Sequence, residues 1–305
     1  MLCYTTQNGS AYCGDSLDLI PNILQNNSID LLFTSPPFPL VTEKEYGNVN
    51  QEKYLEWFMQ FIEVILPKIK DTGSIVLDFG NTWAKGIPAF NIYQFRVLLK
   101  LVDDYGLYLA CPMYWYNPSR PPLPAVFTAK RKLRPVDKID NVWWLCKSPL
   151  EAKADITQVL VPYSKSMKKF FRKHRNNKSM SYQKHDGALP SNLLEIPNTS
   201  NKTQYHRACR KLKIKGQPST MPSKLAEFFI KMLTNEQDLV VDIFAGSNTT
   251  GFVADSLNRR YISIEQRLNY VAMSSFRFLN DIENAEIVYN TILNQSNLPI
   301  DMEQY

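Results

Sequence analysis

The sequence predicts an α/β protein built on a mostly parallel β-sheet that helices cover on both faces. Three observations lead to this prediction. Short apolar runs alternate with longer amphipathic segments, the alternation stops near residue 150, and it resumes from Pro222. The sheet is therefore expected to begin in the first 150 residues, to be interrupted by an insertion, and to be completed by the last part of the chain.

The individual elements follow from the spacing of apolar residues. Buried strands are expected where short apolar runs occur, at residues 29–33, 74–77, 107–110, 142–145, 239–243 and 261–264. Helices are expected where apolar residues recur every three or four positions, at residues 52–68, 91–105 and 224–233, and again from near Thr249. Residues 297–305 are expected to form a frayed tail.

Composition excludes several classes of protein. Hydrophobic residues make up 44% and charged residues 21% of the 305-residue chain, which excludes a disordered or collagen-like protein. No apolar run approaches the roughly 18 residues that span a bilayer, and the first residues lack the features of a signal peptide. The five cysteines form no Cys-x-x-Cys pair, so we expect reduced thiols in a cytoplasmic protein. The three histidines lack acidic or Cys partners at ligand spacing, so no metal site is expected.

Charge is distributed unevenly along the chain. The formal net charge is +6, but residues 156–226 contain fifteen Lys and Arg against two acids, a net charge of +13 that leaves −7 for the remainder. A surface this asymmetric suits a polyanion such as DNA, although a solvated basic region would also explain the charge alone. The expected phosphate contacts lie in one basic run and are Lys168, Lys169, Arg172, Lys173 and Arg175.

A loop of small residues follows the expected strand at 239–243. The segment Asp242-Ile-Phe-Ala-Gly-Ser-Asn-Thr-Thr-Gly251 leads into a helix, whose start offers free N–H groups to a ligand. Glu265 ends the next strand, nineteen residues after Gly246, where a carboxylate can accept both hydroxyls of a ribose. These features favour a nucleoside-containing cofactor over a simple helix cap.

A second motif, Thr34-Ser-Pro-Pro-Phe38, leaves the carboxyl end of the expected strand at 29–33. Ligands bind at that edge in open α/β sheets. Two prolines remove two N–H donors and leave carbonyls free to accept from an amino group. Ser35 adds a hydroxyl, and Phe38 offers a face on which a base can stack. The alternative is a stiff turn capped by serine.

Together these motifs resemble those of the amino-group DNA methyltransferases. Residues 34–38 resemble the catalytic motif in the form typical of cytosine-N4 enzymes, and residues 242–251 resemble the S-adenosylmethionine loop. Residues 217–225 resemble the segment before that loop, and residues 14–16 resemble the short acidic motif that holds the cofactor adenine. The catalytic motif precedes the cofactor loop, which is the permuted order of the β-group. Residues 130–134, 142–144 and 238–242 also resemble the cytosine-N4 branch.

Two residues depart from the common pattern of this family. Asn248 stands where many amino-methyltransferases have glycine, and Gln217 replaces a common histidine. Both positions concern contacts to the methionine end of the cofactor, and neither changes the reaction that the resemblance implies.

The resemblance implies a circularly permuted, Rossmann-like fold that depends on S-adenosylmethionine. Its catalytic part would be residues 1–150, its basic target-recognition insertion 151–216, and its cofactor-binding part 217–305. The implied catalytic residues are Ser35, Pro36, Pro37, Phe38 and Asp78. The implied cofactor-binding residues are Asp15, Ser16, Thr34, Pro222, Lys224, Asp242, Phe244, Ala245, Gly246, Asn248, Thr249, Thr250 and Glu265.

The implied reaction transfers a methyl group to the exocyclic N4 of a cytosine flipped out of double-stranded DNA. Ser35 and the Pro36 carbonyl would accept the amino hydrogens and aim the nitrogen lone pair at the methyl carbon. The resemblance further implies a monomer that acts in a restriction–modification system. Its cognate endonuclease would form no stable complex with it, and a palindromic hexanucleotide such as CAGCTG is the expected target.

Three other functions are alternatives to a cytosine-N4 DNA methyltransferase. An adenine-N6 enzyme of the same fold is the nearest, although serine rather than Asp or Asn at position 35 argues against it. A nicotinamide-dependent oxidoreductase would explain the glycine loop but neither residues 35–38 nor the basic insertion. The third alternative is a DNA-binding module without catalytic activity.

Overall fold

The computed structural model describes residues 1–40, 50–173, 187–199, 203–294 and 298–305. Its main strands are β1 (Leu2–Thr5), β2 (Gly9–Cys13), β3 (Ile29–Thr34), β4 (Ile69–Phe79), β7 (Tyr108–Tyr116), β8 (Ile139–Cys146), β9 (Leu193–Glu195), β10 (Leu239–Asp242), β11 (Arg260–Glu265) and β12 (Ile300–Asp301). Its α-helices are α1 (Ser16–Ile23), α2 (Tyr54–Ile65), α3 (Tyr93–Asp103), α4 (Lys165–Lys173), α5 (Gln204–Lys211), α6 (Ser223–Leu233), α7 (Thr249–Ser256), α8 (Leu268–Ser274) and α9 (Ala285–Leu293). Each strand and helix expected from the periodicity has a counterpart among them.

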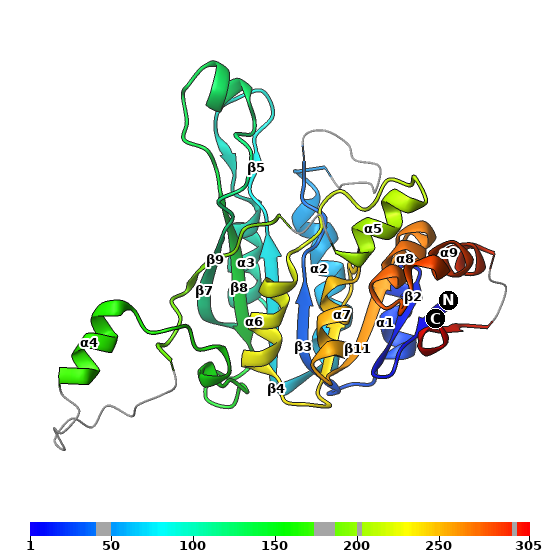
Figure 1. Ribbon diagram of the computed structural model, residues 1–305. Coiled ribbons are helices and arrows are strands. Elements are labelled where there is room, and N and C mark those ends of the chain that lie inside the picture. The colour runs from blue at the N-terminus through cyan, green and yellow to red at the C-terminus, as the bar shows by residue number, and fades with distance from the viewer. Residues whose placement is uncertain (41–49, 174–186, 200–202, 295–297) are drawn as a thin grey trace.

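The described strands form one sheet in the order β12-β1-β2-β11-β10-β3-β4-β8-β7-β9. The five strands from β2 to β4 are mutually parallel, and β8 runs antiparallel between β4 and β7. Helices α1 to α3 pack on one face, and α6 to α8 pack on the other (Figure 1). The predicted fold class, a mostly parallel sheet with helices on both faces, is confirmed.

The central strand β3 shows how the sequence produces this sheet. Its six residues are all buried, as expected for a parallel strand that is covered on both faces. Asp30 is the one charged residue in it, and Lys70 and Lys153 neutralise it at 2.8 and 3.3 Å. Thr34 is the last residue of β3 and lies at the carboxyl end of the strand, where the chain leaves the sheet.

The last residues of the chain differ from the expectation. Within 298–305, β12 pairs in parallel with β1, so this part of the tail is not frayed. Ile300 and Met302 are buried in a core formed with α5, α8 and α9, and this burial holds the tail in place. The N-terminal hairpin of β1 and β2, which the periodicity did not predict, supplies the edge to which the tail adds.

The basic insertion divides into parts with different surroundings. Strand β9 pairs with β7 and so extends the sheet. Helix α5 buries Tyr205, Ala208 and Cys209 in the core that it shares with α8 and α9. Helix α4 has no buried residue and projects beyond the β9 edge of the sheet (Figure 1).

A projection that we call the arm extends from the end of the sheet at which β4 and β7 end, over the β4, β8 and β7 part (Figure 1). It consists of residues 80–91 and 117–138. It contains the small hairpin of β5 (Thr82–Trp83) and β6 (Phe90–Asn91), and a short helical turn at Val126–Lys130. Trp83 stacks on Phe90 with ring centroids 4.4 Å apart and also contacts Phe127, so the two segments of the arm pack against each other.

Candidate active site

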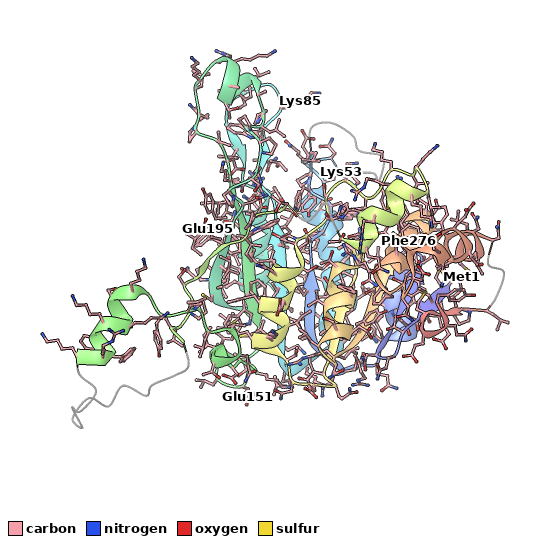
Figure 2. The ribbon with its side chains drawn as sticks, viewed as in Figure 1. Met1, Lys53, Lys85, Glu151, Glu195 and Phe276 are labelled. Atoms are coloured by element: carbon pink, nitrogen blue, oxygen red, sulfur yellow. The ribbon has the colours of Figure 1, made fainter. Side chains whose placement is uncertain are left out.

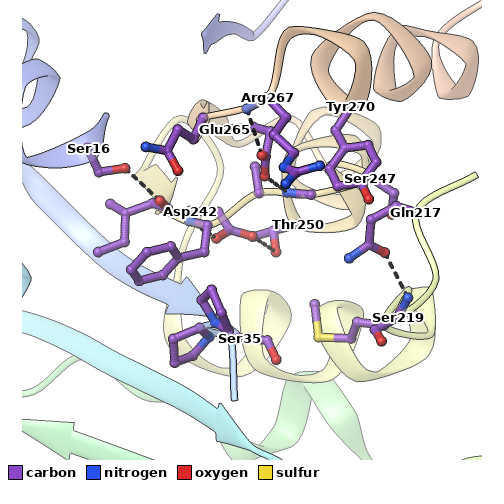
Figure 3. Close-up of a pocket in the computed structure, with 18 of the residues that line it drawn as sticks. Ser16, Ser35, Gln217, Ser219, Asp242, Ser247, Thr250, Glu265, Arg267 and Tyr270 are labelled. Atoms are coloured by element: carbon purple, nitrogen blue, oxygen red, sulfur yellow. Dashed lines mark hydrogen bonds between the residues drawn. The ribbon is translucent and has the colours of Figure 1, made fainter. Parts of the chain in front are cut away.

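A cavity of about 380 Å³ lies at the carboxyl ends of β3, β10 and β11 (Figure 3). Topology brings six segments to it, namely the start of α1, the turn after β3, helix α2, the approach to α6, the loop after β10 and the loop after β11. The lining residues are Asp15, Ser16, Ser35, Pro36, Pro37, Phe38, Trp57, Phe61, Gln217, Ser219, Met221, Asp242, Ile243, Phe244, Ala245, Gly246, Ser247, Thr249, Thr250, Glu265, Gln266, Arg267 and Tyr270.

Most of the residues predicted from sequence meet in this cavity. The catalytic candidates that line it are Ser35, Pro36, Pro37 and Phe38. The cofactor candidates that line it are Asp15, Ser16, Asp242, Phe244, Ala245, Gly246, Thr249, Thr250 and Glu265. The candidates outside its lining are Asp78, Thr34, Pro222, Lys224 and Asn248. Their roles remain predictions, and the contacts of several show what they do in the fold.

Asp242 holds the cofactor loop against the catalytic strand. One carboxylate oxygen accepts hydrogen bonds from the Thr34 hydroxyl at 2.7 Å and from the Phe244 N–H at 3.1 Å. The other accepts from the Thr250 hydroxyl at 2.8 Å. Complete burial raises the pKa of Asp242, and these hydrogen bonds oppose that rise. Thr34 thus supports the site from beneath and does not line the cavity.

The backbone and the contacts of Asn248 show why an asparagine fits where many amino-methyltransferases have glycine. Its backbone is left-handed, with φ +52°, a conformation in which Asn replaces Gly more readily than other residues do. It caps α7, because its side-chain oxygen accepts from the Gly251 N–H at 3.0 Å and from the Ser263 hydroxyl at 2.6 Å. Its amide nitrogen donates to the Tyr4 hydroxyl at 2.9 Å. Asn248 therefore fixes the start of α7 from the interior.

Glu265 lies at the cavity wall with both oxygens anchored. The backbone N–H groups of Gly246 and Arg267 each donate to one oxygen at 2.9 Å. Each carboxylate oxygen has a second lone pair, so both can still accept a hydroxyl from a ligand. Burial raises the pKa of Glu265, and the two backbone hydrogen bonds counter this rise. This geometry is compatible with the recognition of a diol, and that role of Glu265 stays a prediction.

Gln217 contacts the cofactor loop directly. A Cβ at Gly246 would lie 3.2 Å from Nε2 of Gln217, so the glycine lets the amide approach the loop. The Gln217 N–H donates to the Tyr205 hydroxyl at 2.8 Å, and its side-chain oxygen accepts from the Ser219 N–H at 3.2 Å. The sequence shows Gln217 as the first residue of the 217–225 segment and as a departure from the family's common histidine. Its position between α5 and the loop makes it part of the cavity wall.

Aromatic residues of α2 form a wall that sequence reasoning missed. Trp57 and Phe61 line the cavity and contact Phe244, with ring centroids 5.7 and 4.8 Å apart. In the sequence they follow the helical apolar spacing and are indistinguishable from core residues. Arg267 and Tyr270 were also missed, since they follow Glu265 with no motif of their own.

The Ser35 turn rests on the end of β4. Its hydroxyl donates to the main-chain carbonyl of Asp78 at 3.2 Å. In the described part of the chain, the Pro36 carbonyl accepts no hydrogen bond, so it is free to accept one from a ligand. The prolines thus present an open acceptor, as predicted from their missing N–H groups.

Asp78 is buried beneath this turn, and its Oδ1 has no hydrogen-bond partner among the described residues. Burial and then the negative charge of Asp140 raise its pKa well above the ordinary value, while Arg120 and the Ser35 hydroxyl act in the opposite direction. Arg120 is paired with Asp140 through two hydrogen bonds, one of them 2.9 Å long. Burial beneath Ser35 thus stabilises the protonated form of Asp78 relative to that of an exposed carboxyl.

Phe38 depends on the absence of a side chain at Gly80. A Cβ on Gly80 would lie 2.3 Å from Cε2 of Phe38, so the ring packs directly on the glycine backbone. Gly80 is the first residue of the arm, and the Tyr93 hydroxyl donates to its carbonyl. The Phe38 ring, which is predicted to stack on the flipped cytosine, is thus held where the arm begins.

The predicted DNA contacts lie apart from these residues. Lys168, Lys169, Arg172 and Lys173 are exposed on α4, whereas Arg175 falls outside the described residues. Figure 1 shows α4 beyond the β9 edge, away from the strand ends that carry the cavity. Their contact with DNA stays a prediction. Within the described ranges, no group of three His, Cys, Asp or Glu could hold a metal ion, and no helix is long and apolar enough to cross a membrane.

The fold and the site define a class. A Ser-Pro-Pro-Phe turn and a small-residue loop face one cavity at the carboxyl edge of a permuted parallel sheet, and the DNA methylase family model N6_N4_Mtase matches residues 29–276. The chain therefore belongs to this family of DNA methylases, and DNA is its substrate.

Among individual relatives, it is 46% identical to the type II methyltransferase M.PvuII of Proteus hauseri, over 98% of this chain and 93% of the relative. The solved structure of the cytosine-N4-specific PvuII DNA methyltransferase matches with a TM-score of 0.82 and 44% identity, over 97% of this chain and 96% of that chain. A putative DNA modification methylase of Thermus thermophilus, solved with S-adenosyl-L-methionine, is 16% identical with a TM-score of 0.58, over 95% and 96% of the two chains. It shares the fold. The resemblance to the β-group and the methyltransferase fold are thus confirmed.

Proposed function

We propose that the protein transfers a methyl group from S-adenosylmethionine to the exocyclic N4 of a cytosine in duplex DNA, as a modification enzyme of a restriction–modification system. The observation that carries this proposal is the meeting of Ser35 and Pro36 with the 242–251 loop in one cavity. The extent of similarity to the cytosine-N4-specific PvuII enzyme supports it.

The residues of the cavity fit this cofactor. Its volume is within the range of small-molecule sites, about 300–1,000 Å³. Glu265 can accept the two ribose hydroxyls, and Asp15 and Ser16 at the start of α1 line the same cavity and would hold the adenine. The carboxylates of Asp15, Asp242 and Glu265 at the walls suit a cationic sulfonium. When bound, the cofactor would supply an electrophilic methyl group, whose bond to sulfur breaks as the bond to nitrogen forms, so that the cofactor would leave as a neutral thioether.

The chain itself positions the target amino group. Its lone pair is delocalised into the cytosine ring, which makes it a poor nucleophile. Ser35 Oγ and the open Pro36 carbonyl each accept one N–H, which turns the lone pair toward the methyl carbon and places the reacting atoms in line. The product loses its extra proton to Ser35 or to water. Phe38 stacks against the flipped ring, and flipping itself costs a few kcal/mol.

Residues outside the cavity bind the DNA. Residues 151–216 act as the target-recognition region, and Lys168, Lys169, Arg172, Lys173 and Arg175 contact phosphates. The enzyme acts as a monomer in the cytoplasm, and its cognate endonuclease works on the same site without a stable complex. Residues 1–150 form the catalytic part and 217–305 the cofactor-binding part.

One experiment tests the reaction and its sequence context together. DNA from a host that expresses the protein is sequenced with long reads that detect modified bases, and the same DNA is digested to nucleosides for mass analysis. N4-methylcytosine within a palindrome such as CAGCTG is expected. N6-methyladenine would refute the assignment in favour of the adenine enzyme of the same fold. A Ser35→Ala expression strain is the matched control for host methylation.

A further inference from the structure

The arm occupies the side of the molecule on which DNA must approach. The cavity lies at the carboxyl ends of β3, β10 and β11, and the arm projects from the same end of the sheet, beside them, over β4, β8 and β7 (Figure 1). Lys85, labelled near its tip in Figure 2, lies far from α4 in that view. A base that reaches Ser35 and Pro36 therefore belongs to a duplex that lies on the arm's side of the sheet.

The arm is strongly basic. Its two segments contain seven Lys and Arg against a single acid, Asp137, a net charge of +6 that equals that of the whole chain. Arg120 is occupied by its pair with Asp140, and Lys138 donates to the Pro118 carbonyl. The exposed cations are Lys85, Lys130, Arg131, Lys132 and Arg134.

Three of these cations are consecutive, at residues 130–132. None of the ion pairs among the described residues involves them, so their charges are not used inside the protein. Leu123, Val126 and Leu133 are also exposed on the arm. Exposed cations and apolar side chains suit the phosphate and sugar edge of a nucleic acid.

The arm is also joined to the catalytic turn. Nε2 of Gln51 donates to the Pro39 carbonyl at 2.9 Å and to the Trp83 carbonyl at 3.0 Å. Arg134 Nε donates to the Pro88 carbonyl at 3.1 Å, which ties the 130–134 segment to the hairpin. Together with the contact of Phe38 on Gly80, these hydrogen bonds hold the arm at a defined place relative to Ser35.

We propose that the arm is a DNA-binding element, in which Lys130, Arg131 and Lys132 contact the phosphates of the duplex whose base enters the cavity. This inference rests on the DNA substrate of the proposed function and adds a surface outside the predicted 151–216 insertion. The arm supplies binding and orientation without reading sequence, because phosphate contacts carry no base information.

The test compares two double variants that each remove two positive charges. Lys130→Gln/Arg131→Gln alters the arm. The control, Lys68→Gln/Lys231→Gln, alters the opposite edge, since Lys68 precedes β4 and Lys231 lies in the last turn of α6. Affinity for a fluorescent duplex containing the target site is measured by anisotropy in salt raised from about 50 to about 200 mM. Removing one phosphate interaction flattens the slope of log affinity against log salt by about 0.9.

The arm variant is expected to bind the duplex more weakly, and its slope of log affinity against log salt should be about 1.8 shallower than that of wild type. As salt rises from about 50 to about 200 mM, wild type should therefore lose roughly tenfold more affinity than the arm variant does. Melting temperature and S-adenosylmethionine affinity are expected to stay at the control's level. An arm variant with the affinity and slope of the control would overturn the proposal. DNA binding is measured separately from methylation. Failure of the wild-type enzyme to methylate cytosine would reject the proposed reaction, but the DNA affinities of the arm variant and the control could still be compared.

Discussion

The Thr34 hydroxyl donates a 2.7 Å hydrogen bond to Asp242 across 208 residues of sequence. Thr34 is the last residue of β3 and Asp242 the last of β10, and each is followed directly by one half of the site. The same carboxylate also binds the hydroxyl of Thr250 in the first turn of α7. One buried side chain thus sets the spacing between the catalytic turn and the cofactor loop.

Replacing Thr34 with valine removes this link while keeping the shape of the side chain. A hydrogen bond to a charged group contributes about 1.5–3 kcal/mol, so we expect Thr34→Val to lower the free energy of unfolding by that order. Methyl transfer should fall as well, because the two halves of the site lose their register. Thr291→Val, on the exposed face of α9, is the control. Denaturant unfolding and methylation rates indistinguishable from that control would contradict this role.

Ser35→Ala tests the acceptor in the catalytic turn. We expect the loss of most methyl transfer with S-adenosylmethionine affinity retained, because the Ser35 hydroxyl bonds to the Asp78 carbonyl and, among the described residues, to neither the cofactor loop nor Glu265. Calorimetric titration gives the affinity, and transfer of a labelled methyl group to DNA gives the rate. Ser148→Ala, in the loop after β8, is the matched control. A Ser35→Ala enzyme that methylates at the control's rate would remove Ser35 from the mechanism.

Gly80→Ala tests the support beneath Phe38. The new Cβ would lie 2.3 Å from the Phe38 ring, which must move away from the place of the flipped base. We expect kcat for methylation to fall at least tenfold, which corresponds to an activation free energy higher by about 1.4 kcal/mol. Gly106→Ala is the control, since it adds a methyl group at φ +66° with no atom within 4 Å. Equal rates for the two variants would show that the ring's position is unimportant.

Asp78→Asn tests the buried acid through the pH dependence of stability. The raised pKa of Asp78 means that the native state keeps a proton that the unfolded chain releases at lower pH. The associated stability is fully present below about pH 4 and is lost as pH rises through the raised pKa. Asn cannot ionise, so the melting temperature of the variant relative to wild type should increase from about pH 5 to about pH 8.

The control for this experiment is Asp103→Asn, which removes an exposed carboxylate near the end of α3. A difference between Asp78→Asn and wild type that does not change with pH would contradict the buried, protonated state. Methylation by the same variant tests the predicted catalytic role separately. Wild-type rates at every pH would confine Asp78 to the fold.

The α4 cations make a prediction distinct from that for the arm. Neutralising Lys168, Lys169 and Arg172 together should flatten the salt dependence of DNA affinity by about 0.9 for each phosphate interaction that the substitutions remove. Anisotropy titrations in increasing salt measure this slope. A DNA affinity of the wild-type protein that is independent of salt would show that the charge asymmetry of the sequence has no role in binding.

The periodicity of apolar residues predicted the sheet well, because the strands at 29–33, 74–77 and 239–243 are buried on both faces and so appear as continuous apolar runs. It could not predict β1, β2 and β12. These short strands carry polar residues, and they pair with one another and, through β2, with β11. The tail is ordered for the same reason, since burial of Ile300 and Met302 is a long-range effect.

The two motifs of the site were recognisable in the sequence because backbone chemistry requires their residue types at fixed spacing. A turn with free carbonyls needs prolines, and a loop close to a ligand needs small residues. Their meeting in one cavity, the support of Phe38 by Gly80, and the walls formed by Trp57 and Gln217 depend on contacts between segments far apart in the chain. Tertiary structure alone decided these features, and it alone placed a second basic surface, the arm, beside the catalytic edge.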